Sequence, residues 1–75
     1  MSESSNPQPA LGAAIRELRA KSGATQEEIA QAADITGAHL SKIERGLTNP
    51  TWGTVGAIAK ALSVTIVDVA KRATE

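Results

Sequence analysis

The sequence contains no cysteine, no phenylalanine and no tyrosine, and it has a single tryptophan and a single histidine. Without cysteine, the chain can form neither a disulfide framework nor a thiolate metal site. One histidine, His39, argues against a zinc site made by protein ligands alone, because such sites need several histidine or cysteine ligands. We therefore expect no metal and no cofactor.

Long apolar segments are also missing. No apolar run approaches the roughly 20 residues that a membrane-spanning helix needs. No charged-then-apolar leader opens the sequence, so nothing suggests secretion. We expect a cytoplasmic protein that has no membrane partner.

The scarcity of aromatic residues limits the core of this 75-residue chain. Ala, Leu, Ile and Val must fill the interior, and small side chains let helices approach closely. A core of this size supplies only a few kcal/mol of net stability, so we expect the chain to form oligomers. Eight basic and eight acidic residues give a formal net charge of zero. Overall charge therefore offers no argument for nucleic-acid binding.

Local signals divide the chain into a tail and one domain of short helices. Residues 1–8 are polar and predict a flexible N-terminal tail, and residues 9–75 predict the domain. Pro9 suits a first helical turn, and Gly23 suits a helix end. Threonines stand where helix N-caps are expected, two of them in capping boxes with an acidic residue three positions on. These threonines are Thr25, Thr36, Thr51 and Thr65, the boxes being completed by Glu28 and Asp68.

Apolar residues recur at helical spacing within each of these segments and predict five helices. No segment alternates with period two over the length of a strand, so the predicted fold is all-α without strands. We place the single tryptophan in the core rather than on a base-stacking surface. The residues expected to face inward are Leu11, Ile15, Leu18, Ile29, Ala30, Ala33, Leu40, Ile43, Leu47, Trp52, Val55, Ile58, Ala59, Leu62, Ile66 and Val69.

The link between the second and third predicted helices is unusually short. Only two residues separate Ala33 from the N-cap Thr36, and a link that tight forces the sharp crossing of a helix-turn-helix. The small Ala30 suits the point where the two helix axes approach. The turn also needs a residue that tolerates positive φ, and Asp34 stands there, a type that enters this region more readily than most.

Several separated motifs follow one another in a familiar order: TQEEIA at 25–30, LSKIERG at 40–46, NPT at 49–51 and IAKAL at 58–62. Together they resemble the XRE family of helix-turn-helix regulators, the lambdoid phage repressor and Cro type, over roughly residues 9–70. This resemblance implies a compact five-helix domain whose third helix enters the DNA major groove, acting as a dimer on a palindromic operator. The sequence departs from the family pattern at the turn, where aspartate replaces the usual glycine. It departs again at Gly37, where the family often carries a base-reading side chain.

The resemblance assigns roles to residues on the outer side of the third helix, predicted over 36–45. Methyl, hydroxyl and ammonium groups there can contact base edges, and basic or amide side chains around them can reach phosphate oxygens. Solvated charge on a helix face is the alternative for Lys42 and Arg45, and a place at the rim of the core is the alternative for His39. The expected base contacts are Thr36, Gly37, Ala38, Ser41 and Lys42, and the expected phosphate contacts are Gln26, Arg45, His39, Asn49 and Arg16.

Two further predictions concern structure and assembly. The resemblance implies that Arg19 and Glu44 form a structural pair beneath the DNA face. In the segment after Leu62, Val67 is expected to point outward, at a position where the family commonly has a polar residue. We therefore predict a two-fold dimer through the fifth helix, with Val64, Val67 and Ala70 at its centre.

Two other classes of function compete with DNA binding. An enzyme is disfavoured, because the sequence offers no catalytic residues: it has no nucleophile with a spaced histidine and carboxylate, and no glycine-rich phosphate loop. A protein-interaction module of the same fold, such as an antitoxin or coactivator, stays open and is favoured by zero net charge and by the small residues Gly37 and Ala38. No small-molecule effector is evident.

Overall fold

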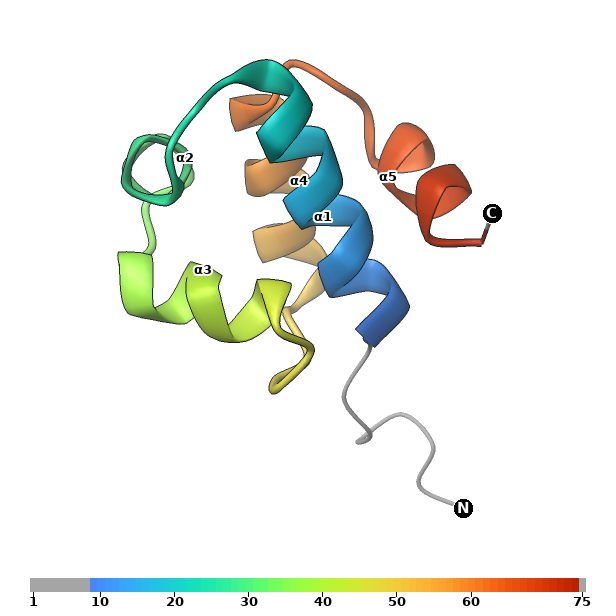
Figure 1. Cartoon of the computed structure of the whole chain (residues 1–75), viewed down its shortest axis with the longest axis horizontal. Coiled ribbons are helices and arrows are strands. Elements are labelled where there is room, and N and C mark those ends of the chain that lie inside the picture. Colours follow the sequence, from blue (N-terminus) through green and yellow to red (C-terminus); the bar gives the residue numbers. More distant parts are fainter. Residues whose placement is uncertain (1–8, 75) are drawn as a thin grey trace.

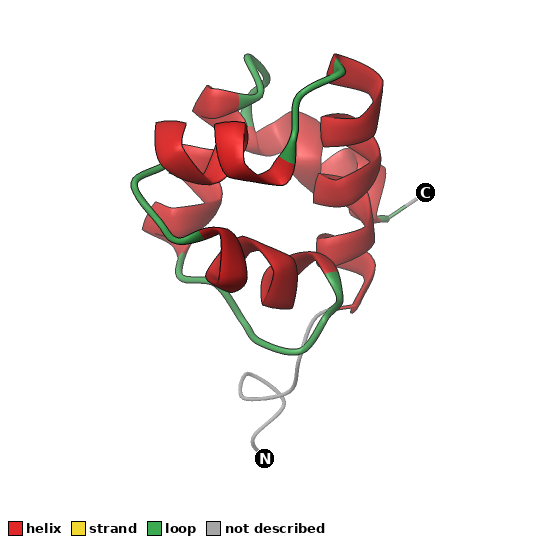
Figure 2. Cartoon of the chain, turned by 60° about the vertical axis from the view of Figure 1, so that its left-hand side comes forward, coloured by secondary structure: helices red, strands yellow, loops and turns green. Residues whose placement is uncertain are grey.

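The structure is a computed structural model that describes residues 9–74, so the predicted tail at residues 1–8 lies outside the described part. The described residues form five helices and no strand: α1 Pro9–Ser22, α2 Gln26–Ala32, α3 Gly37–Glu44, α4 Trp52–Ala61 and α5 Ile66–Ala73. The predicted all-α fold is confirmed. Short loops join the helices (Figure 2).

The helices α1 and α4 form the middle of the molecule, with α2 and α3 on one side and α5 on the other (Figure 1). Helix α1 contacts both α3 and α5, whereas α4 contacts α2 and α5. The largest fully buried side chains come from four helices and meet between these layers: Ile15, Leu40, Ile43, Val55, Ile58 and Val69. The core is therefore aliphatic, as the composition predicts.

Four of the five helices begin at the predicted threonines. In each case the threonine side chain accepts a hydrogen bond from a backbone N–H three residues on, which satisfies one of the free donors of the first turn. Both predicted capping boxes are complete. At the start of α5, hydrogen bonds from Thr65 hold the pKa of the exposed Asp68 below its usual range.

The structure overturns the prediction that Leu47 and Trp52 are buried. Leu47 is 58% exposed, because α3 has already ended at Glu44 and Gly46 turns the chain with φ 73°, so helical spacing no longer applies at this position. Trp52 is 69% exposed although it lies three residues before the buried Val55. It is the first residue of α4 and stands at the helix end, beyond the core.

Two of the tight turns use residues other than glycine at positive φ. Asp34 has φ 62°, as expected for the turn between α2 and α3, and Ser63 has the same φ between α4 and α5, which the sequence did not indicate. Among the described residues, no single helix is long and apolar enough to cross a bilayer, and the only pair that reaches the required length and composition, α4 with α5, is bent by 101°.

Candidate nucleic-acid interface

The turn between α2 and α3 has a fixed geometry. The backbone N–H of Ile35 donates to the carbonyl of Ala30 at 2.9 Å, and that of Ala33 donates to Ile29 at 2.9 Å. The left-handed conformation of Asp34 completes the turn, and Thr36 then caps α3 with a 3.0 Å bond from the His39 N–H. Helix α3 with its two caps covers the predicted 36–45 segment.

Helix α3 also rests on α1 at a point of very close backbone approach. A Cβ atom at Gly12 would overlap the carbonyl oxygen of Ile43 and would lie 3.0 Å from that of Glu44. Only glycine fits between these backbones, because real Cβ atoms do not approach carbonyl oxygens that closely. Gly12 therefore allows the close distance between the backbone of α1 and the C-terminal end of α3.

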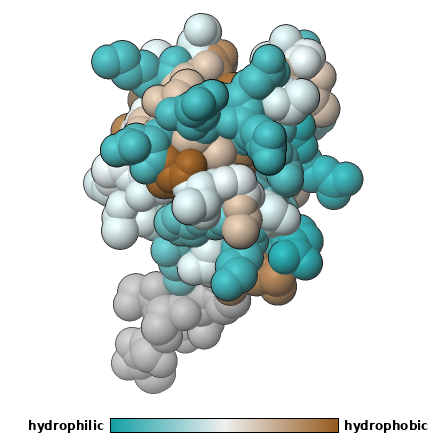
Figure 3. Space-filling view, turned by 90° about the vertical axis from the view of Figure 1, so that its left-hand side faces the viewer, coloured by the Kyte–Doolittle hydropathy of each residue, from teal (hydrophilic) through white to brown (hydrophobic). Residues whose placement is uncertain are grey.

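The outer side of α3 carries a line of exposed residues at helical spacing. Ala38, Lys42 and Arg45 are exposed, whereas Leu40, Ile43 and Glu44 are buried on the inner side. Of the other predicted base contacts, Thr36 is exposed, and Gly37 and Ser41 are half-buried. The face made by α2 and α3 is largely hydrophilic or intermediate in colour (Figure 3). The structure thus brings the five predicted base contacts together on one helix end and face.

The predicted phosphate contacts are spread around this helix. Arg45 caps the end of α3, and His39 is half-buried within α3. Arg16 is exposed one helical turn after Gly12, on the face of α1 that meets the end of α3. Asn49 is half-buried in the loop after α3, where it also lines an apolar groove.

The predicted pair of Arg19 and Glu44 is present and fully formed. Arg19 Nε donates to Glu44 Oε2 at 2.7 Å, and its Nη2 donates to Oε1 at 3.0 Å, which is a bidentate contact. The Glu44 side chain is 1% exposed. This hydrogen-bonded contact holds the pKa of Arg19 above its ordinary value. A third donor, Gln26 Nε2, reaches Oε1 of Glu44 at 2.9 Å.

Sequence reasoning missed this bond from Gln26. The two residues are 18 positions apart and lie on different helices, so helical spacing could not pair them. It also missed a hollow of about 280 Å³ between α2 and α3, lined by Glu27, Ala30, Gln31, Ile35 and Gly37. Gly37 has no side chain that could fill this hollow. The acidic residue beside it is Glu27, whose Cγ would lie 3.6 Å from a Cβ atom at Gly37.

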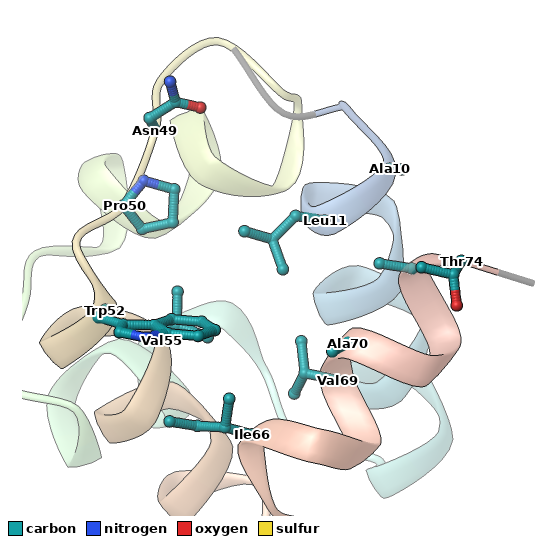
Figure 4. A pocket seen from close by; sticks show the side chains of 11 residues that line it. Ala10, Leu11, Asn49, Pro50, Trp52, Val55, Ile66, Val69, Ala70 and Thr74 are labelled. Carbon is teal, nitrogen blue, oxygen red and sulfur yellow. The ribbon is translucent and has the colours of Figure 1, made fainter. Parts of the chain in front are cut away.

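The apolar groove lies away from this face, between the N-terminal ends of α1 and α4 and one side of α5. It has a volume of about 540 Å³ and is lined by Ala10, Leu11, Asn49, Pro50, Trp52, Val55, Ile66, Val69, Ala70, Ala73 and Thr74. The indole of Trp52 lies beside Val55 on one wall, and the α5 side chains lie on the other (Figure 4).

The residues of the predicted dimer centre differ in their surroundings. Val67 is 63% exposed, as expected. Ala70 is exposed and lines the apolar groove, whereas the half-buried Val64 lines a separate hollow with Leu18, Asp68, Lys71 and Arg72. The three predicted residues therefore do not line one common hollow.

The features described above together indicate the class of protein. Among residues 9–74, no group of three or more His, Cys, Asp or Glu side chains is placed to hold a metal ion. A tightly turned helix pair presents a polar outer helix that carries lysine and arginine, supported from below by a buried ion pair. This fold and site define a helix-turn-helix domain.

Comparisons with known proteins agree with this class. The model of the family described as "Helix-turn-helix domain" matches residues 10–72. The chain is 37% identical over 59 residues to an uncharacterized HTH-type transcriptional regulator, y4dJ of Sinorhizobium fredii, covering 79% of this chain and 77% of that one. It is 40% identical over 55 residues, 73% of this chain, to the HTH-type transcriptional regulator DdrOP3 of Deinococcus deserti, and this match spans 43% of the length of DdrOP3. The chain therefore spans less than half of that relative.

Solved structures agree as well. The clp gene regulator ClgR from Corynebacterium glutamicum superposes with a TM-score of 0.87 at 34% identity, covering 89% of this chain and 87% of that one. The restriction-modification controller protein C.AhdI from Aeromonas hydrophila gives 0.81 at 26% identity, covering 83% and 94%. The chain belongs to the helix-turn-helix domain family, and it is a helix-turn-helix domain of the XRE type.

Proposed function

We propose that the chain is a sequence-specific transcriptional regulator that binds double-stranded DNA as a homodimer on a palindromic operator. The observation that carries this proposal is the outer line of α3, in which Ala38, Lys42 and Arg45 are exposed at helical spacing while the inner side is buried. A helix presented in this way can enter the major groove, which is wide enough for it.

The residues around α3 divide into two roles in this proposal. Lys42 donates to guanine O6 or N7, and the methyl groups of Thr36 and Ala38 meet thymine methyls. Ser41 bonds to a base edge, and Gly37 lets the α3 backbone approach the bases closely. Phosphate oxygens are contacted by Arg45, His39, Gln26, Arg16 and Asn49, which position the helix without reading the sequence.

The second copy supplies the second recognition helix. Two such helices must lie about 34 Å apart to enter successive major grooves, so one surface of the chain must set that distance. Val67 and Trp52 are large exposed apolar side chains. Trp52 and Ala70 both line the apolar groove, and Val67 lies on α5 one helical turn before Ala70. We assign the two-fold contact to α5 and this neighbouring groove, with Val64 at its edge.

Binding-site selection tests the proposal even though the operator sequence is not known. The full chain is incubated with random DNA duplexes, and the bound sequences are recovered and read. We expect a palindrome with half-sites about 10 base pairs apart, and a steep fall of affinity with salt that corresponds to several phosphates per dimer. No enriched sequence together with a flat salt response would contradict the proposal.

A protein-interaction module is the second candidate, and the exposed Trp52 beside an apolar groove is the observation that favours it. Exposed tryptophans are frequent anchors of protein interfaces. In that case the groove holds a different protein rather than a second copy. Sedimentation of the purified chain separates the two, because a monomer at high micromolar concentration would favour a foreign partner.

A further inference from the structure

The buried carboxylate of Glu44 connects the ion pair to the side chain that is expected to contact phosphate. It accepts hydrogen bonds from Arg19 Nε at 2.7 Å, Arg19 Nη2 at 3.0 Å and Gln26 Nε2 at 2.9 Å. These donors come from α1 and from the first residue of α2, and Glu44 itself is the last residue of α3. One carboxylate therefore joins all three helices that build the candidate interface.

The chemistry of this contact fixes which way round the Gln26 amide stands. An ionised carboxylate only accepts hydrogen bonds, so the amide must turn its nitrogen toward Glu44 and its oxygen away. Rotating the amide by half a turn would bring two oxygen acceptors together and leave Glu44 with one donor fewer. The amide nitrogen has two N–H groups, and one of them suffices for Glu44.

The charge of Glu44 is balanced without help from DNA. Both carboxylate oxygens accept a hydrogen bond from the guanidinium of Arg19. The third nitrogen of that group, Nη1, donates to the carbonyl of Ala24 at 3.1 Å. Arg19 is thereby committed to the protein interior, and its side chain is only 17% exposed. Gln26, the first residue of α2, is the other donor to Glu44, and it is half-buried.

We propose that Glu44 is a positioning residue for DNA binding, which holds the Gln26 amide with its nitrogen oriented so that the second N–H donates to a phosphate oxygen. This inference rests on the proposed DNA-binding function. A bond from the amide to an ionised carboxylate also polarises the remaining N–H and makes it a better donor. The proposed role of Glu44 thus differs from that of a simple structural pair, because its effect on DNA affinity passes through Gln26.

A double-mutant cycle tests this dependence. The variants are Glu44→Gln, Gln26→Met and the double substitution, with Glu17→Gln as the control for the same chemical change on the exposed part of α1. Affinity for the selected operator and for random duplex is measured where all variants are folded, as judged by thermal unfolding. We expect Glu44→Gln to weaken both DNA affinities about three- to tenfold when Gln26 is present, and to have no further effect in the Gln26→Met chain.

The cycle separates the possible outcomes. Equal losses from Glu44→Gln in both backgrounds would overturn the positioning role, because a purely structural effect does not depend on Gln26. Failure of the unsubstituted chain to bind any duplex would instead contradict the proposed function. Glu17→Gln should leave affinity within about twofold of the parent, because the contact of Glu17 Oε2 with Arg72 Nη1, at 3.5 Å, lies at the surface.

A second measurement avoids substitution, in case Glu44→Gln does not fold. In nitrogen-15 spectra of the free, unsubstituted chain, the side-chain N–H proton of Gln26 that donates to Glu44 should lie downfield of the corresponding proton of an exposed glutamine. Adding operator duplex should shift the other signal. If neither side-chain signal of Gln26 moves when the duplex binds, the proposed contact is wrong.

Discussion

The α2–α3 face and the α4–α5 side of this small domain are built on opposite principles. On the α2–α3 face, the exposed side chains of α3 are small, polar or charged, and beneath them the buried Glu44 is held by two hydrogen bonds from Arg19. On the α4–α5 side, Trp52 and Val67 are left exposed, and Trp52 lines an apolar groove. The first surface suits a polar, charged partner such as DNA, and the second suits an apolar one. A chain of zero net charge can therefore still carry a DNA-binding face, because charge is arranged locally.

The largest expected effect comes from removing the support of the polar face. Gly12→Ala drives a methyl group into the carbonyl oxygen of Ile43, where neither backbone can yield easily. We expect a loss of about 3 kcal/mol of unfolding free energy, measured by urea denaturation. Gly53→Ala is the matched control, because its methyl group would lie 3.9 Å from its nearest neighbour, Thr51 Oγ1. That control should stabilise the chain by about 0.5–1 kcal/mol, and equal effects would contradict the role of Gly12.

The next effect concerns the apolar side. Val67→Lys places like charges across the proposed two-fold axis while leaving the buried Val69 in place. The monomer should stay folded, but the dimer should weaken about hundredfold, or about 2.7 kcal/mol, and cooperative operator binding should be lost. Sedimentation and operator titration measure the two quantities. Ala20→Lys, at an exposed position on α1, is the control, and a Val67→Lys variant that still dimerises would place the interface elsewhere.

A smaller effect separates reading from positioning on the polar face. Lys42→Ala should cost about 1–3 kcal/mol at the selected operator and relax the preference at one base pair per half-site. Gln26→Ala should weaken specific and random duplexes by the same factor, since phosphate contacts carry no sequence information. Quantitative gel shifts on operator, single-base variants and random DNA measure both. If the two variants behaved alike, α3 would not be the reading helix.

The smallest effect is at the turn between α2 and α3. Asp34 has φ 62°, a conformation that glycine adopts without steric cost. We expect Asp34→Gly to leave stability unchanged or to raise it by up to about 1 kcal/mol, measured by thermal unfolding. A clear loss would show that the aspartate side chain stabilises the turn in some other way.

Local features were the most predictable part of this structure. Thr25, Thr36, Thr51 and Thr65 could be identified as N-caps because a cap acts within four residues of chain. The left-handed turn at Asp34 followed from the short link between two helices. Periodicity likewise found most of the aliphatic core, although Leu11, Leu18 and Ile66 are only partly buried against it.

The failures occurred where a helix ends or where helices meet. Helical spacing placed Leu47 and Trp52 inside. Leu47 is exposed because α3 ends before it, at Glu44, and Trp52 is exposed because it is the first residue of α4. The bond between Gln26 and Glu44 joins residues from two helices, so it depends on how α2 and α3 cross. The approach of Gly12 to the end of α3 is likewise a property of packing that neither segment indicates alone.

The threonine caps have one consequence for how such a domain can change over evolution. Because Thr36 fixes where α3 begins through a bond to its own third residue, that starting point does not depend on the outward side chains at positions 38, 42 and 45. Side chains at those positions can be replaced together while α3 still begins at the same residue. New binding preferences can then arise by a few surface substitutions at little cost in stability, because the Thr36 cap is unchanged.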